Sequence, residues 1–126
     1  YWNSPFMHPT IMIRKEAYNA VNGYRISKET RRCEDIDLFM NMYAKGFIGY
    51  NIQEKLYLYR MLNDPNVKYR PMKYRIDEAV VKFKGYKNMG NLFFGIPYVI
   101  KPILVGLIPQ KFLYHIKKTT YKSKRK

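Results

Sequence analysis

Three carboxylates lie within four positions of this chain, at Glu34, Asp35 and Asp37, directly after the cationic pair Arg31-Arg32. A carboxylate held beside a hydroxyl group can take its proton while the oxygen attacks an electrophile, so general-base chemistry is one interpretation. The other is structural, because acidic side chains are favoured in the first turn of a helix by the helix dipole. The short acidic motif alone does not decide between these two interpretations.

Further side chains could take part in such a site. His8, which precedes Pro-Thr, could contact an acceptor or a diphosphate, or could be structural. Arg31 and Arg32 could contact phosphates or remain solvated. Cys33 has no histidine near it in sequence, and neighbouring carboxylates raise a thiol pKa, so we do not expect a nucleophile there. His8, His115 and the one cysteine show no metal-ligand spacing.

The acidic motif must be positioned by the elements around it. Residues 34–45 predict a helix that stops at Gly46, and residues 14–21 predict a shorter helix that Asn22-Gly23 would end. Residues 24–33 are polar and charged, which indicates a loop. Three apolar or alternating runs predict strands, at residues 11–13, 47–52 and 56–59.

The second half of the chain has a different character. The turn-forming residues 63–66 (Asn-Asp-Pro-Asn) mark a predicted boundary between a region 1–62 and a region 63–126. Pro71 could open a helix that runs to about residue 84 and ends at Gly85. Residues 92–109 are strongly apolar but contain Pro97 and Pro102, so a bent interfacial or re-entrant segment fits better than a straight span.

Residues 8–60 resemble the family 2 glycosyltransferases, which have the GT-A fold. No single motif is specific, but an ordered set over some fifty residues is, and it comprises His8-Pro9-Thr10, Ile13-Arg14-Lys15, Val21-Asn22-Gly23-Tyr24-Arg25, Glu34-Asp35-Ile36-Asp37-Leu38, Gly46, Asn51-Ile52-Gln53-Glu54 and Leu56-Tyr57-Leu58-Tyr59-Arg60. The resemblance covers the first half of the chain well and the second half loosely. One departure is Asn41, where the family often carries Arg, and we leave Asn41 out of the predicted site.

The resemblance implies an α/β fold: the C-terminal portion of a GT-A domain, followed by a mostly helical tail. It implies that Asp35 is the base of an inverting transfer, that Glu34 orients Asp35 or binds an acceptor hydroxyl, and that Asp37 holds the helix in place. A nucleotide-sugar donor and a glycan or lipid-linked acceptor are the implied substrates. A divalent cation, Mg²⁺ or Mn²⁺, is the implied cofactor, with ligands in a half of the domain that this chain does not contain. The chain begins Tyr-Trp-Asn, without Met, so we expect a piece of a longer protein that is inactive alone.

Charge is unevenly distributed along the chain. Residues 1–63 carry nine Lys/Arg and six Asp/Glu, whereas residues 64–126 carry fifteen and three, out of a net charge of +15. The run 110–126 has seven Lys/Arg and no acid, with apolar residues between them, a pattern typical of a helix lying in lipid headgroups. We therefore expect a cytoplasmic protein, peripheral on the inner face of the cell membrane.

Two other interpretations stay open. The positive charge and thirteen tyrosines also suit a nucleic-acid-binding module, which would need a basic groove with interleaved aromatic residues. Because the lysines gather at one end beside an apolar run, we favour lipid and expect no nucleic acid. The second alternative is a non-catalytic interaction module derived from a transferase.

Overall fold

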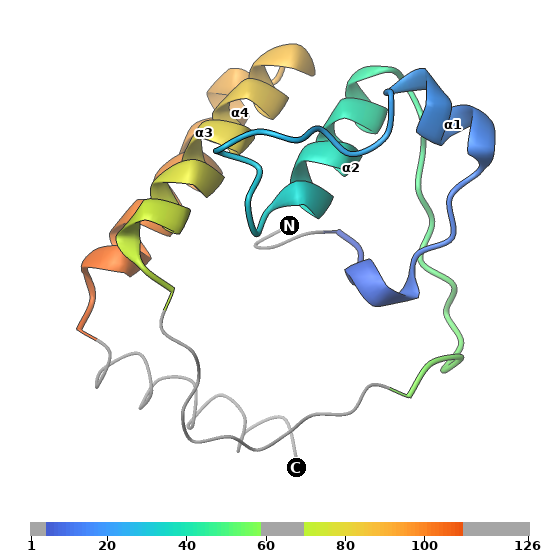
Figure 1. The fold of residues 1–126 in the computed structure, drawn as a ribbon, viewed down its shortest axis with the longest axis horizontal. Coiled ribbons are helices and arrows are strands. Elements are labelled where there is room, and N and C mark those ends of the chain that lie inside the picture. The colour runs from blue at the N-terminus through green and yellow to red at the C-terminus, as the bar shows by residue number, and fades with distance from the viewer. Residues whose placement is uncertain (1–4, 59–69, 110–126) are drawn as a thin grey trace.

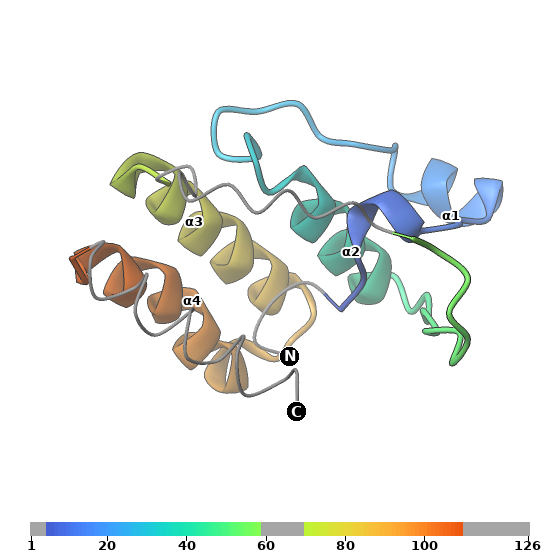
Figure 2. The same ribbon diagram turned by 90° about the horizontal axis from the view of Figure 1, so that it is seen from below.

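The computed structural model describes residues 5–58 and 70–109, and within these ranges every regular element is a helix. The elements are the 3₁₀ helix η1 (His8–Thr10) and the α-helices α1 (Lys15–Ala20), α2 (Glu34–Ala44), α3 (Met72–Asn88) and α4 (Leu92–Leu107). Figure 2 shows α2, α3 and α4 in a row, with α3 between the other two. The expectation of an α/β GT-A portion is therefore wrong for the described residues.

The predicted strands fail for a physical reason. A strand exists only where its backbone N–H and C=O groups pair with a neighbouring strand. Residues 11–13 form an extended link from η1 to α1, and residues 47–58 run past α2 without a strand partner among the described residues. Their apolar side chains are left in solvent, as Ile48 (92% exposed) and Leu58 (100% exposed) show. The alternation of apolar and polar residues indicated a strand with two different faces, but it does not show whether a neighbouring strand is present to pair with it.

The two short-range helix predictions in the first half are confirmed. Helix α1 is followed by Asn22 and Gly23 with φ angles of 58° and 65°, the left-handed backbone that ends a helix. Helix α2 is followed by Gly46 with φ 83°. These stop signals depend on local backbone geometry alone, so the sequence contains them in full.

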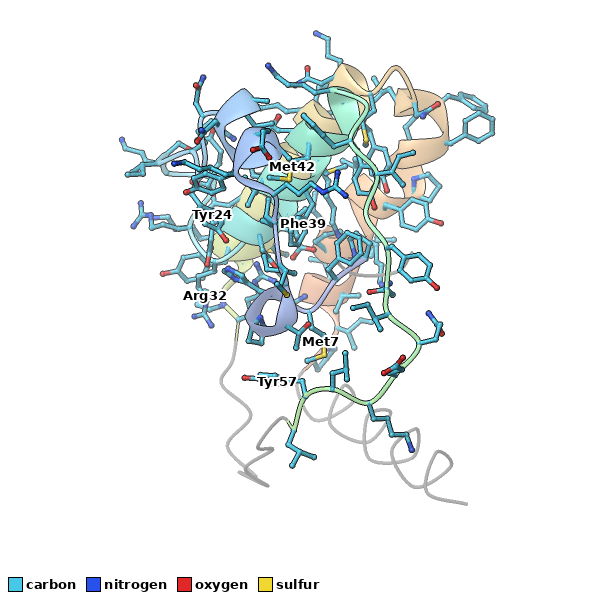
Figure 3. The ribbon with its side chains drawn as sticks, turned by 90° about the vertical axis from the view of Figure 1, so that its right-hand side faces the viewer. Met7, Tyr24, Arg32, Phe39, Met42 and Tyr57 are labelled. Carbon is cyan, nitrogen blue, oxygen red and sulfur yellow. The ribbon has the colours of Figure 1, made fainter. Side chains whose placement is uncertain are left out.

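Helix α2 supplies much of the small core. Leu38, Phe39 and Met42 are buried on one side of it, and Figure 3 shows Phe39 and Met42 in the middle of the molecule. Phe6 packs edge-on against Phe39, with ring centroids 5.4 Å apart. This packing fixes the orientation of α2, and with it the direction in which the acids of its first turn project.

Helix α3 does not stop at Gly85 as predicted but continues to Asn88. Gly85 is buried, and a Cβ atom there would lie 2.5 Å from Sδ and 2.8 Å from Cβ of Met40 in α2. The glycine is thus a point of close approach between the two helices rather than a helix end. Helix α3 packs on α2, so a helix of region 63–126 contacts a helix of region 1–62.

Helix α4 is one continuous helix with Pro97 and Pro102 inside it. It packs along α3 (Figure 1), where a Cβ atom on Gly95 would lie 2.2 Å from the Tyr86 ring. In the part of the chain that is described, no helix has the length and apolar character needed to cross a membrane. The predicted turn at residues 63–66 and the basic run 110–126 lie outside the described residues.

Candidate functional site

Asp37 is the acid that holds α2 in place. Its carboxylate is buried and accepts two hydrogen bonds from the Arg25 guanidinium, from Nε to Oδ2 at 3.2 Å and from Nη2 to Oδ1 at 2.7 Å. Asn41 Nδ2 donates to the same carboxylate at 3.1 Å. The hydrogen bond to Asp37 is the largest cause that raises the pKa of Arg25 above its usual range. This carboxylate is buried and already accepts hydrogen bonds from three protein donors.

Glu34 and Asp35 differ from Asp37 in their burial and in their hydrogen bonding. Both lie in the first turn of α2 and are half-buried. Among residues 5–58 and 70–109, no side chain or backbone group forms a hydrogen bond or ion pair with either carboxylate. Two free carboxylates next to one that is already hydrogen bonded are an arrangement in which Asp35 and Glu34 can meet a ligand.

His8 lies close to this acidic turn through Tyr24. The His8 Nε2 atom and the Tyr24 hydroxyl are hydrogen bonded at 2.8 Å, and the Tyr18 ring packs against Tyr24 with centroids 6.0 Å apart. Burial is the largest cause that raises the pKa of Tyr24, and Tyr18, Asp35 and Glu34 raise it further because negative groups disfavour a phenolate. Tyr24 therefore stays a neutral phenol near neutral pH. Its hydroxyl group is hydrogen bonded to His8 and is also influenced by the charges of Asp35 and Glu34.

Sequence reasoning missed Tyr24 and Arg25 as members of the site, although both lie inside the quoted motif Val21–Arg25. The signal was present in that motif, since a tyrosine and an arginine follow the helix-ending turn directly. Their partners lie 16 and 12 residues away in sequence, and nothing local predicted those contacts.

Arg32, one of the two arginines predicted to bind substrate, contacts helix α3. The Arg32 guanidinium lies over the Tyr74 ring of α3, with Cζ 5.3 Å from the centroid, a favourable cation–π geometry. Arg70 Nη2 donates to the Arg32 carbonyl at 3.0 Å, and Arg32 has a positive φ of 63°. Arg31 is exposed. Figure 3 shows Tyr24 and Arg32 on the same side of the molecule.

The loop that carries Arg25 is held in place by hydrogen bonds and ion pairs. Thr30 is buried, and its Oγ1 donates to the Arg25 carbonyl at 2.8 Å. Glu29 accepts from Arg25 Nη1 at 2.9 Å and from Lys84 Nζ of α3 at 2.7 Å. The hydrogen bond from Lys84 and then that from Arg25 lower the pKa of Glu29. The loop is thus joined to both α2 and α3 by charged contacts.

Cys33 precedes the acids directly but is inert. Its side chain is fully buried, and Sγ donates to the Glu29 carbonyl at 3.0 Å. Burial raises the pKa of the thiol to about 12, so the thiolate is not formed near neutral pH. The expectation that Cys33 is not a nucleophile agrees with this environment.

A metal site is not formed by the described side chains. Within residues 5–58 and 70–109, no three His, Cys, Asp or Glu side chains gather closely enough to hold an ion. The Mg²⁺ or Mn²⁺ that the resemblance implies therefore stays a prediction.

The chain is similar to a protein named as a glycosyltransferase. The chain is 38% identical over 117 residues to the Bacillus subtilis (strain 168) protein named "Putative glycosyltransferase EpsE". The match covers 91% of this chain and 42% of that protein, so the chain spans less than half of its relative's length. No protein-family model matches the chain, and no solved structure does.

Proposed function

We propose that this chain forms the acceptor side of a glycosyltransferase of family 2 type, with Asp35 as the general base. The relationship to a protein named as a glycosyltransferase supports the class of reaction, because it extends over 91% of the chain and includes the acidic turn. The donor would be a nucleotide sugar and the acceptor a glycan or a lipid-linked sugar.

The residue assignment rests on a difference in hydrogen bonding among the three acids. Asp37 accepts hydrogen bonds from Arg25 and Asn41, whereas the carboxylates of Glu34 and Asp35 have no partner in the described part of the chain. A general base must reach the hydroxyl proton that it removes, at about 2.6–3.2 Å, so it cannot be occupied by permanent donors. Asp35 and Glu34 meet that requirement and Asp37 does not.

In the proposed reaction the Asp35 carboxylate takes the proton of the acceptor hydroxyl as its oxygen forms a bond to the anomeric carbon of the donor. The bond from that carbon to the diphosphate oxygen breaks on the opposite face, so the configuration inverts and the nucleoside diphosphate leaves. Glu34 accepts a hydrogen bond from a second acceptor hydroxyl. Donor phosphates and the divalent metal would be held by residues outside this chain.

His8, Tyr24 and Tyr18 fit a role in holding the acceptor. Their rings pack in series, with centroids 5.8 Å apart for His8 and Tyr24 and 6.0 Å apart for Tyr18 and Tyr24. Tyrosine combines an apolar ring face with a hydroxyl group, which suits a sugar that presents both C–H and O–H groups. Burial raises the pKa of Tyr24 most, and the charges of Tyr18, Asp35 and Glu34 raise it further, which supports a place for the Tyr24 hydroxyl near the acidic turn.

The test is Asp35→Asn in the full-length protein. We expect transfer from nucleotide sugar to acceptor to fall by about 10²–10⁴-fold, because the amide cannot accept the hydroxyl proton. Donor affinity, measured by calorimetry, should stay within about twofold, because Asp35 is assigned to the acceptor.

Glu16→Gln is the matched control, since Glu16 is also an acid in the first turn of a helix, is exposed, and lies on α1. It should leave both transfer and donor binding unchanged. Unchanged turnover in Asp35→Asn would remove the base assignment and would favour a non-catalytic module.

A further inference from the structure

Within residues 5–58 and 70–109, helix α4 has a stripe of large apolar side chains that no other described element covers. The stripe consists of residues spaced three or four apart, which places them on one helix face: Phe93, Ile96, Ile100, Leu104 and Leu107. Phe93 is 80% exposed, Leu104 57% and Leu107 68%. The opposite face is packed on α3, where Gly95 and Pro102 are buried. Figure 2 shows α4 at the edge of the row formed by α2, α3 and α4.

The charge of the surrounding chain selects the partner. Glu78 is the last acidic residue, and residues 79–126 contain eleven Lys/Arg and no Asp or Glu. A second copy of the chain would bring the same positive excess and would be repelled. Nucleic acid would meet the charge but offers no apolar layer to cover Phe93 and Leu104. An anionic lipid surface satisfies both the charge and the apolar stripe.

The backbone of α4 suits the membrane interface better than the hydrocarbon interior. Pro97 is on the exposed side and has no N–H, so the Phe93 carbonyl has no donor four residues ahead of it. Such a carbonyl is costly in hydrocarbon but can bind water among the headgroups. The absence of a spanning helix from the described residues leaves an interfacial position as the one that uses the stripe.

We propose that α4 lies in the plane of an anionic bilayer with its outer stripe inserted among the headgroups, and that the acid-free basic stretch that includes it strengthens this attachment. Insertion of the stripe supplies the hydrophobic contribution, and each Lys or Arg near the surface adds electrostatic attraction that salt weakens. This proposal is independent of the transfer reaction.

The first experiment measures co-sedimentation of the full-length protein with vesicles. We expect binding to mixed phosphatidylcholine–phosphatidylglycerol vesicles, little binding to phosphatidylcholine alone, and weaker binding at high salt. The triple variant Phe93→Gln/Ile100→Gln/Leu104→Gln should partition about a thousandfold less into these vesicles, because each buried apolar side chain contributes roughly a factor of ten.

The matched control removes apolar residues that are at least as exposed but lie elsewhere. Met12→Gln/Ile26→Gln replaces side chains that are 98% and 99% exposed, and it should bind vesicles as the unaltered protein does. Asp35→Asn should also bind normally, so that failure of the base assignment and failure of membrane attachment are separate results. Helix content by circular dichroism verifies that the triple variant is folded.

A second measurement does not need the triple variant to fold. Cys33 is buried and its thiol is not ionised near neutral pH, so a single introduced cysteine can be labelled selectively. An environment-sensitive fluorophore on Leu104→Cys should shift to the blue when anionic vesicles are added, whereas the same label on Tyr50→Cys should not.

Three outcomes would overturn the proposal. The first is vesicle binding by the triple variant equal to that of the unaltered protein. The second is a Leu104 label that stays in water in the presence of bound vesicles. The third is an unaltered protein that ignores vesicles and is a dimer in solution, with the triple variant a monomer, since the stripe would then be a contact between copies.

Discussion

Arg25 and Asp37 form a two-point contact, Nε to Oδ2 at 3.2 Å and Nη2 to Oδ1 at 2.7 Å, that joins the loop before α2 to the buried side of its first turn. The Asp37 side chain is 8% exposed and that of Arg25 is 37% exposed. One end of the pair is thus held in the protein while the other reaches the surface, and the pair fixes the turn on which Glu34 and Asp35 stand.

Arg25→Met should destabilise the fold by about 2–3 kcal/mol, because it leaves the Asp37 carboxylate buried with one hydrogen-bond donor fewer on each oxygen. The urea midpoint of the full-length protein, followed by circular dichroism, measures this. Arg14→Met is the control, since Arg14 is exposed at the start of α1. Equal midpoints for the two variants would show that the Arg25–Asp37 contact contributes nothing to stability.

Gly85→Ala should destabilise the packing of α3 on α2 by about 1–3 kcal/mol, because the new methyl group would meet Met40 Sδ at 2.5 Å. Met40→Ala in the same chain should recover part of this loss by vacating the space. A double-mutant cycle of unfolding free energies measures the coupling between the two positions. Additive effects would mean that Gly85 and Met40 do not constrain each other.

Glu29 should make stability depend on pH in the acid range. Its pKa is lowered in the folded protein from 4.5 by hydrogen bonds from Lys84 and Arg25. A depressed folded pKa means that the unfolded chain binds the proton more readily, so the contribution is complete above about pH 4.5 and is lost as pH falls below it.

Urea midpoints measured at about pH 6 and about pH 3 test this dependence. Glu29→Gln should lower the midpoint at the higher pH and flatten the change between the two. A variant with the same slope as the unaltered protein would assign the acid sensitivity to other carboxylates. Glu54→Gln is a control, because Glu54 is exposed in the extended segment after α2.

The elements predicted correctly are those that local backbone chemistry determines. The turns after α1 and α2 follow from Asn22-Gly23 and Gly46, whose positive φ angles need no distant partner. The strand predictions failed because alternation cannot supply a neighbouring strand. Gly85 was interpreted as a helix end because the sequence does not show that Met40 of α2 lies against it.

The candidate site, like the fold, was predicted only in part. The family resemblance, and not the acidic motif alone, gave Glu34 and Asp35 different roles from Asp37. The structure shows Asp37 bound by Arg25, while the roles of Glu34 and Asp35 remain predictions. The contact of His8 with Tyr24 and the position of Arg32 over Tyr74 depend on how the loop and α3 pack. Such contacts join residues far apart in sequence, where local patterns carry no information.

The bridge from Arg25 through Glu29 to Lys84 has a geometric consequence. It ties the loop before α2 to α3, and α3 packs against α4, so the turn that carries Asp35 and the outer stripe of α4 belong to one connected framework. A protein attached to a bilayer by that stripe would hold Asp35 at a set height above the lipid. Only hydroxyl groups at that distance from the membrane would then reach Asp35, so the acceptor would be selected by its position as well as by its chemistry.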